Sequence, residues 1–350
     1  MSCVALINII IDPGEIYLKK IIGDIKSKEF SDKLYHSENG VIQTGWNERL
    51  IKTALAKTAG DFDCIILGSS HMLQISSVRN TGGIRDKCHN LLNLSVSGGG
   101  LEDIAIFSYL VLNNPNLPKR VFIGIDPWTI KFGMDSRYGA YKSYYEKMNV
   151  LLSQQGAGEN ISYFKKAVQN LFNGEYFYYS ILSLSDNDKE EFSLLFQKAI
   201  LYPDKNFSYE DGYAEPVTLK DGSHVYSQAW ILAQKNKSIA IGGGAYKISG
   251  AKYDPVALEY FRRLIKLYQS LNVNVNLIMT PYHPNVFKSG QTKPVKYFKV
   301  IDETVKKLSQ QNNVEYYGSF FPNKLGCKDS EFFDFMHATN KCLNRIDFRL

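Results

Sequence analysis

Short apolar runs that alternate with amphipathic stretches of helix length constrain the fold of this chain more than any other feature of its sequence. Five runs have the length of a buried strand and cover residues 64–67, 91–96, 121–125, 273–279 and 314–317. Amphipathic stretches with apolar residues at three- and four-residue spacing begin at Leu101, Pro255 and Pro294. This pattern predicts an α/β fold, a three-layer sandwich built on a mainly parallel sheet.

The alternation lapses between residues 131 and 250, a stretch dense in aromatic residues such as those at 176–179. We interpret this stretch as an inserted, mainly helical cap. The core then comprises residues 61–130 and 251–350. Residues 1–60 form an N-terminal segment whose apolar run at 4–11 is far shorter than the roughly 20 residues of a spanning helix. We interpret that run as the remnant of an anchor, with a helix after it.

Charge and cysteine usage exclude several classes of function. The net charge is 41 − 35 = +6 over 350 residues, and the basic residues are scattered, so no nucleic-acid partner is expected. None of the five cysteines has a spacing suited to zinc, so we expect no structural metal. Cys64 lies inside an apolar run and is interpreted as a small buried hydrophobic residue.

Polar residues that follow the predicted strands are the first candidates for a site, because sites in open α/β sheets form at the carboxyl ends of the strands. Gly68-Ser69-Ser70 follows the first run and allows a tight turn that presents the Ser70 hydroxyl. A serine needs a base to become a nucleophile. Asp334 and His337 are three residues apart, a spacing that lets the carboxylate orient the imidazole. We therefore predict a triad of Ser70 as nucleophile, His337 as general base and acid, and Asp334 as its partner.

The loop after the second run predicts an oxyanion hole. Ser97 is followed by three glycines, so the backbone amides of Gly98 and Ser70 can converge on a developing negative charge. One such donor contributes about 10² to 10³ in rate. Four further residues at strand ends are candidates for substrate contact: His71, Asp126, Trp128 and His283.

Other readings of these motifs remain open. The Gly68-Ser69-Ser70 segment also suits a plain strand-to-helix turn with a serine cap. The triglycine loop also suits a phosphate at a helix N-terminus, although neither common nucleotide-binding glycine motif is complete.

Three short motifs carry a family resemblance. Gly68-Ser69-Ser70, the segment 93–98 and Asp334-x-x-His337 resemble, in order and position, the first, second and fifth blocks of SGNH (GDSL-like) hydrolases. The match looks closest to the branch of cell-surface polysaccharide O-acyltransferases and lipoteichoic-acid D-alanylation proteins. Residues 8–13 are similar to the segment that follows the membrane anchor in such proteins.

The resemblance implies a flavodoxin-like SGNH fold and a serine esterase or O-acyltransferase that forms an acyl-enzyme. It implies a cell-surface glycan as substrate, acetyl as the acyl group, a membrane protein as acyl donor and no cofactor. The expected location is the extracytoplasmic side of the cell envelope if an anchor is missing from this version of the chain, and the cytoplasm otherwise.

One departure from the family pattern concerns the third block, which is normally Gly-x-Asn-Asp with the asparagine donating to the oxyanion. This chain has Gly124-Ile125-Asp126-Pro127. An ionised Asp126 cannot donate a hydrogen bond. The departure supports an alternative function, a non-catalytic glycan-binding or assembly subunit that retains the fold.

Overall fold

The computed structural model describes residues 29–38, 40–42, 48–153, 200–201, 216–235, 253–288 and 293–349. The predicted anchor remnant and the aromatic residues at 176–179 lie outside these ranges. No helix in the described part of the chain is long and apolar enough to cross a bilayer.

Five parallel strands form the central sheet of the described chain, in the order β3-β2-β4-β8-β9. The strands are β2 (Cys64–Leu67), β3 (Leu91–Asn93), β4 (Arg120–Gly124), β8 (Asn274–Met279) and β9 (Glu315–Gly318). The predicted α/β class and parallel sheet are thus confirmed. Numbered along the chain, the strands lie in the order 2-1-3-4-5 of flavodoxin-like sheets, which reverses between β2 and β4. Ligands of such sheets bind in the crevice outside the carboxyl ends of the strands at this reversal.

Helices begin and end close to the predicted boundaries. The main helices are α3 (Glu48–Ala56), α4 (Leu101–Leu112), α5 (Lys142–Ser153), α9 (Gln228–Lys235), α10 (Pro255–Ser270) and α12 (Lys293–Asn312), with short α11 (Asn285–Lys288) and α13 (Asn340–Leu343). Asp254 caps α10 by accepting a hydrogen bond from the amide of Val256 at 2.8 Å.

The second predicted strand is shorter than expected and ends at Asn93. The Asn93 side chain accepts from the amide of Ser95 and donates to the carbonyls of Met72 and Ile75. These bonds turn the chain into the glycine loop.

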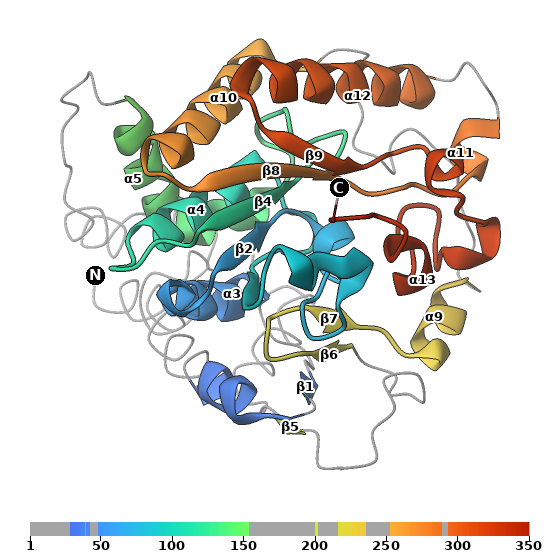
Figure 1. Cartoon of the computed structure of the whole chain (residues 1–350), viewed down its shortest axis with the longest axis horizontal. Helices are drawn as coiled ribbons and strands as arrows, with labels where there is room; N and C mark the ends of the chain where they lie inside the picture. The colour runs from blue at the N-terminus through green and yellow to red at the C-terminus, as the bar shows by residue number, and fades with distance from the viewer. Residues whose placement is uncertain are drawn as a thin grey trace, which may run out of the picture.

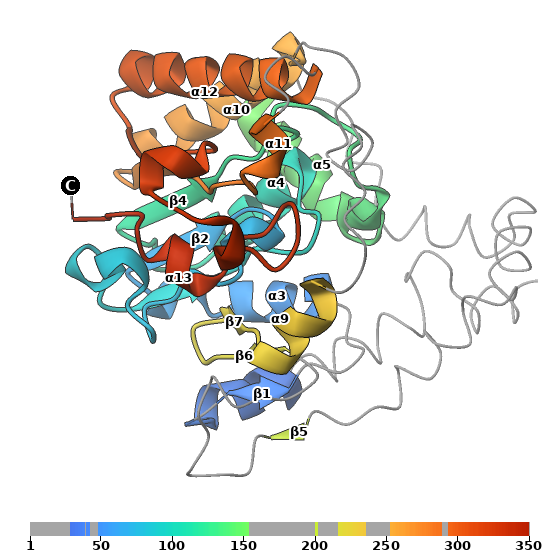
Figure 2. The ribbon, with the colours of Figure 1, turned by 90° about the vertical axis from the view of Figure 1, so that its right-hand side faces the viewer.

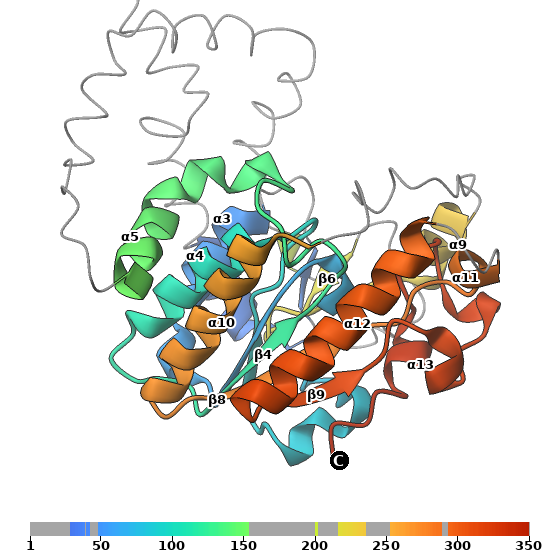
Figure 3. The ribbon, with the colours of Figure 1, turned by 90° about the horizontal axis from the view of Figure 1, so that it is seen from above.

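The two faces of the sheet are covered differently. Alternate residues such as Ile65, Val121 and Leu277 pack in one large core with the long helices. Figures 1 and 3 show α10 and α12 side by side along the strands. The other face carries Ile66 and Phe122 and is covered by short turns at 70–88 and 320–348, which include α13 (Figure 2). The arrangement is compatible with three layers, one of them built from turns.

Two disulfides cross-link these turns. One of them includes Cys64, which is therefore not a free buried thiol as its apolar surroundings suggested. Cys64 at the start of β2 is bonded to Cys88, and Cys327 is bonded to Cys342. All four sulfur-bearing residues belong to the core of the second face. The sequence alone predicted no pairing, because spacing does not determine which thiols meet in the fold.

The described parts of the predicted insertion contain helices and strands, and they contact the core. Helix α5 packs on α4 and α10. A hairpin of β6 (Val217–Thr218) and β7 (His224–Val225) joins a small antiparallel sheet with β1 (Val41–Ile42) and β5 (Ile200–Leu201). The N-terminal segment and the insertion are therefore paired through one sheet.

Asp221, in the turn of this hairpin, fastens it to the core. The carboxylate is buried and accepts hydrogen bonds from Ser76 and Ser77 and from the amide of Val78. Its other oxygen accepts from Ser223 within the hairpin. The buried Lys52 of α3 adds bonds from its Nζ to the carbonyls of Asn93 (2.8 Å) and Gly222 (2.5 Å).

We expect reduction of the disulfides to destabilise the fold. The Cys327–Cys342 bond closes a loop with a sequence separation of 15, and such a constraint stabilises a protein by about 3 kcal/mol. The melting temperature should fall when dithiothreitol is added and should fall similarly in a Cys327→Ala/Cys342→Ala variant. A variant with all four cysteines replaced serves as the control, because reductant should not lower its melting temperature further. A wild-type melting temperature that is insensitive to reductant would contradict the assignment.

Candidate active site

Ser70 and His337 meet at the carboxyl edge of the sheet although 267 residues separate them. Ser70 begins a 3-10 turn directly after β2, and its Oγ lies 2.8 Å from Nε2 of His337. The distance is within the range for a nucleophile and its base. Both side chains are partly exposed, so the pair is open to a reactant.

Asp334 holds the imidazole from the other side. Its Oδ2 lies 2.7 Å from Nδ1 of His337, and its Oδ1 accepts from the amides of Met336 (2.7 Å) and His337 (2.6 Å). Burial acts to raise the pKa of Asp334, but the nearby His337 and these hydrogen bonds outweigh it and hold the pKa below its ordinary value. An ionised Asp334 favours the proton on Nδ1, which leaves Nε2 free to accept the proton of Ser70.

Two rings hold the His337 ring between them. Phe333 stacks on it at a centroid distance of 5.3 Å with an interplanar angle of 1°, and His71 stacks at 4.5 Å and 25°. Burial first, and the nearby His337 second, lower the pKa of His71 well below its ordinary value. His71 is therefore neutral at physiological pH and stacks on the base without adding a charge.

The amides of Ser70 and Gly98 remain available for an oxyanion. Neither amide donates a hydrogen bond to any residue in the described part of the chain. The amide of the next residue, Gly99, is bonded to the carbonyl of Val96 at 2.9 Å. Gly98 has a φ of +65°, and a Cβ there would lie 2.4 Å from Nη2 of Arg137. Residues with a side chain rarely adopt this φ, so any substitution would strain the backbone at this amide.

The peptide before Gly98 is fixed by charged side chains. The amide of Ser97 donates to Oε2 of Glu48 at 2.5 Å, and the Ser97 carbonyl accepts from Nη2 of Arg137 at 2.7 Å. The buried Arg49 makes two bonds of 2.7 and 2.9 Å to Asp103 beneath the loop. Glu48 and Arg49 belong to α3, so the N-terminal segment supports the candidate oxyanion loop.

A carboxylate of the chain already occupies the amide at the start of α4. The amide of Gly100 donates to Oδ2 of Asp103 at 3.1 Å. It is therefore not available to a phosphate at this helix N-terminus. The geometry therefore argues against the nucleotide-binding interpretation.

The four residues predicted to contact substrate are all buried. Their exposed fractions are 4% for His71, 0% for Asp126, 4% for Trp128 and 7% for His283. Trp128 donates from Nε1 to the carbonyl of Gly99 at 3.2 Å, and Nδ1 of His283 accepts from the amide of Asn285 at 3.1 Å. A buried side chain offers a substrate almost no surface, and substrate contact by these four residues stays a prediction.

Asp126 lies in a buried polar group behind the triad. Its Oδ1 accepts from the hydroxyl of Tyr282 at 3.0 Å and lies 3.9 Å from Nε2 of His71. Burial raises the pKa of Asp126 to about 6, against the opposing effects of hydrogen bonds from Ser69 and Tyr282 and of the nearby His337.

Several residues of the site had no recognisable signal in the sequence. Glu48 contacts Ser97 from a helix 49 residues upstream, and Phe333 gains its role only because its ring faces His337. Cys327 and Cys342 flank the Asp334–His337 segment in the sequence, and this flanking was the one available hint that the segment is closed into a loop.

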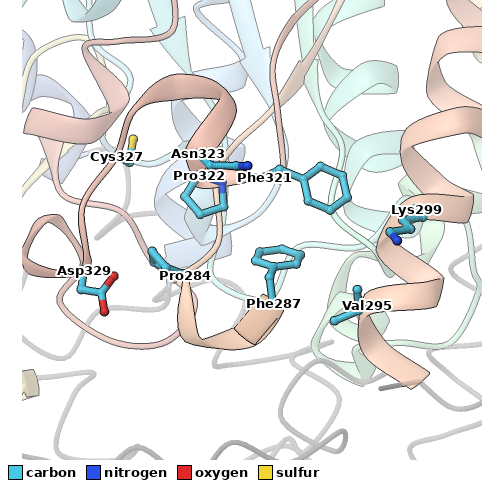
Figure 4. Close-up of a pocket in the computed structure, with 9 residues that line it drawn as sticks. All are labelled: Pro284, Phe287, Val295, Lys299, Phe321, Pro322, Asn323, Cys327 and Asp329. Atoms are coloured by element: carbon cyan, nitrogen blue, oxygen red, sulfur yellow. The ribbon is translucent and has the colours of Figure 1, made fainter. Parts of the chain in front are cut away.

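A pocket of about 460 Å³ lies elsewhere and contains no member of the triad. Figure 4 shows the rings of Phe287 and Phe321 beside it, with Lys299 of α12 at one rim and Asp329 at the other. No cluster of histidine, cysteine, aspartate or glutamate residues within the described ranges is suited to hold a metal ion.

A search against protein-family models and a search of curated proteins each find no match for this chain.

We expect the stability gained by Asp126→Asn to depend on pH. Well below pH 3.8 the Asp126 carboxyl is protonated in both the folded and the unfolded chain. The pKa of this carboxyl is 3.8 in the unfolded chain and about 6 in the folded one, so its protonation stabilises the fold at low pH. This stabilisation is lost as the pH rises through about 6. Asparagine cannot ionise, so the variant avoids this loss.

The free energy of unfolding of the Asp126→Asn variant relative to wild type should therefore rise by about 2 kcal/mol between pH 4 and pH 7.5, measured by urea denaturation. An unchanged difference at the two pH values would show that the carboxyl titrates normally.

Proposed function

We propose that this protein is an SGNH-like serine esterase or O-acyltransferase acting on acyl groups, in the first place acetyl, of a cell-surface glycan. The observation that carries the proposal is the 2.8 Å distance between Ser70 Oγ and His337 Nε2, with Asp334 at 2.7 Å behind the imidazole. The glycan and the acyl group follow from the resemblance of the three sequence motifs to the SGNH acyltransferase branch.

In the first half of the proposed reaction, Ser70 Oγ attacks the acyl carbonyl carbon while His337 Nε2 accepts the hydroxyl proton. The carbonyl oxygen becomes an oxyanion that the amides of Ser70 and Gly98 stabilise. His337 then gives the proton to the leaving alcohol, and an acyl-Ser70 ester remains.

In the second half, water or a sugar hydroxyl attacks this ester. His337 accepts the proton of the attacking group and returns it to Ser70 Oγ as the ester breaks. Water as the attacking group makes the protein an esterase, and a sugar hydroxyl makes it an acyltransferase. The proposed partners are the glycan and a membrane protein that supplies the acyl group.

The disulfides support an extracytoplasmic location. Disulfides persist in oxidising compartments and are rare in the cytosol of most organisms. Here one bond lies in the strand that leads to Ser70, and the other encloses Asp334 and His337. They support the proposal that the protein acts on the extracytoplasmic side of the cell envelope.

The alternative function is a non-catalytic glycan-binding or assembly subunit. The observation in its favour is Asp126, which stands where the SGNH pattern has an oxyanion-binding asparagine and is fully buried. The two unpaired amides favour the enzyme, because they supply oxyanion donors without that side chain.

A fluorophosphonate probe tests the proposal. We expect wild-type protein to be labelled on Ser70 and the Ser70→Ala variant to show no labelling. Ser270→Ala is the matched control, because Ser270 ends α10 at the amino edge of the sheet, opposite the triad, and its loss should leave the labelling in place. Asp334→Asn should slow labelling by about 10² or more, because the imidazole loses the group that sets its tautomer.

If wild-type protein is not labelled, or if Ser70→Ala still supports glycan acylation in cells, the subunit function is the correct one.

A further inference from the structure

A pair of aromatic rings from the insertion packs on Phe333, the ring that stacks on the imidazole of His337. Tyr226 and Trp230 stack on each other at a centroid distance of 4.4 Å and an angle of 25°. Both rings contact Phe333, at 5.3 and 5.2 Å, and Phe333 is the ring that stacks on His337. Figures 1 and 2 show α9, which carries Trp230, next to the C-terminal segment around α13.

Exposure distinguishes this pair from the other aromatic residues around the triad. Phe333, Tyr282 and Trp128 are at most 4% exposed, whereas Tyr226 and Trp230 are half-buried. The adjoining surface of α9 is open, since Ala233, three residues after Trp230 on the same side of the helix, is exposed. A substrate that approaches the triad can therefore touch the rings of Tyr226 and Trp230 and none of the three others.

The pair also lies between the two halves of the site. The ring of Tyr226 lies 5.3 Å from that of Phe333 and 6.2 Å from that of His224, whose Nε2 lies 3.7 Å from Oε1 of Glu48. Burial raises the pKa of Tyr226, and the charges of Glu48 and Asp334 raise it further. Glu48 holds the amide of Ser97 in the oxyanion loop, and Asp334 belongs to the triad. The Tyr226 hydroxyl has no hydrogen-bond partner among the described residues.

The backbone under the pair is firmly attached. Ser227 caps α9 by accepting from the amide of Trp230 at 3.0 Å, and the amide of His224 donates to the carbonyl of Leu73 at 2.6 Å. The Asp221 hydrogen bonds hold the preceding turn to residues 76–78. The rings are thus presented from a fixed segment beside the segment that carries Ser70.

We propose that Tyr226 and Trp230 form the platform on which the sugar ring that carries the acyl group packs while Ser70 attacks. The chemistry fits a sugar, whose C–H face is apolar and whose edges carry hydroxyls. Two stacked rings cover the apolar face, and the phenol of Tyr226 is available to the hydroxyls. This inference rests on the proposed function. It moves the sugar contact from the buried Trp128 to Trp230.

Two acetate esters distinguish an effect on the platform from an effect on the triad. Glucose pentaacetate has a sugar ring, and vinyl acetate has none. We expect Trp230→Ala to lower kcat/KM for glucose pentaacetate about tenfold, mainly through a higher KM, and to change that for vinyl acetate by less than about twofold. Trp230→Phe should retain most of the activity toward the sugar ester. Tyr316→Ala, which removes a 39% exposed aromatic residue of β9, is the matched control and should leave both substrates unaffected.

The outcomes distinguish the platform from the proposed function. Equal losses on both esters would overturn the platform and show that Trp230 only supports Phe333 and His337. A wild-type protein that reacts with fluorophosphonate but does not prefer the sugar ester, or that is insensitive to Trp230→Ala, would overturn the platform and leave the triad in place. A wild type that the probe does not label would overturn the proposed function, and the platform with it.

Discussion

The geometry of the candidate site depends on one apolar face of the central sheet. Side chains of a strand alternate between faces, so Ile66, Phe122 and Ile278 form a second core opposite the long helices. The turn after β2 buries Met72 on this face, and the C-terminal segment buries Phe332 there. Because both segments cover the same few strands, Ser70 and His337 come into contact although 267 residues separate them in the sequence.

Burial alone places segments to within a few ångströms, whereas catalysis needs side chains fixed more closely. Disulfides and the hydrogen bonds of a buried carboxylate fix these segments more closely. The Cys327–Cys342 bond closes the loop that holds Asp334 and His337, and the Cys64–Cys88 bond ties the strand before Ser70 to its neighbour. The bonds of Asp221 attach the insertion to the segment after Ser70. Parts of the N-terminal segment, the insertion and the C-terminal segment therefore converge on one edge of the sheet.

The strands and helices of the core could be predicted because their signals are local. The periodicity of residues 255–270 and the proline at its first position define α10 without reference to the rest of the chain. The segment after residue 93 could not be predicted in this way, because the Asn93 side chain ends β3 through bonds to Met72 and Ile75, which precede it in the sequence. For the same reason the disulfide of Cys64 and the burial of Trp128 could not be predicted, because their partners Cys88 and Gly99 are determined by the fold.

The sequence by itself determined the alternation of strands and helices, the parallel sheet, and the residue types that suit acyl transfer at the strand ends. Only the tertiary structure decided which of those residues are accessible and which lie behind the triad, as Asp126 and His71 do. Local periodicity reports which side of an element is apolar, and it contains no information about what covers that side. Exposure, disulfide pairing and the neighbours of a catalytic ring all depend on contacts between distant segments, which are settled only when the whole chain packs.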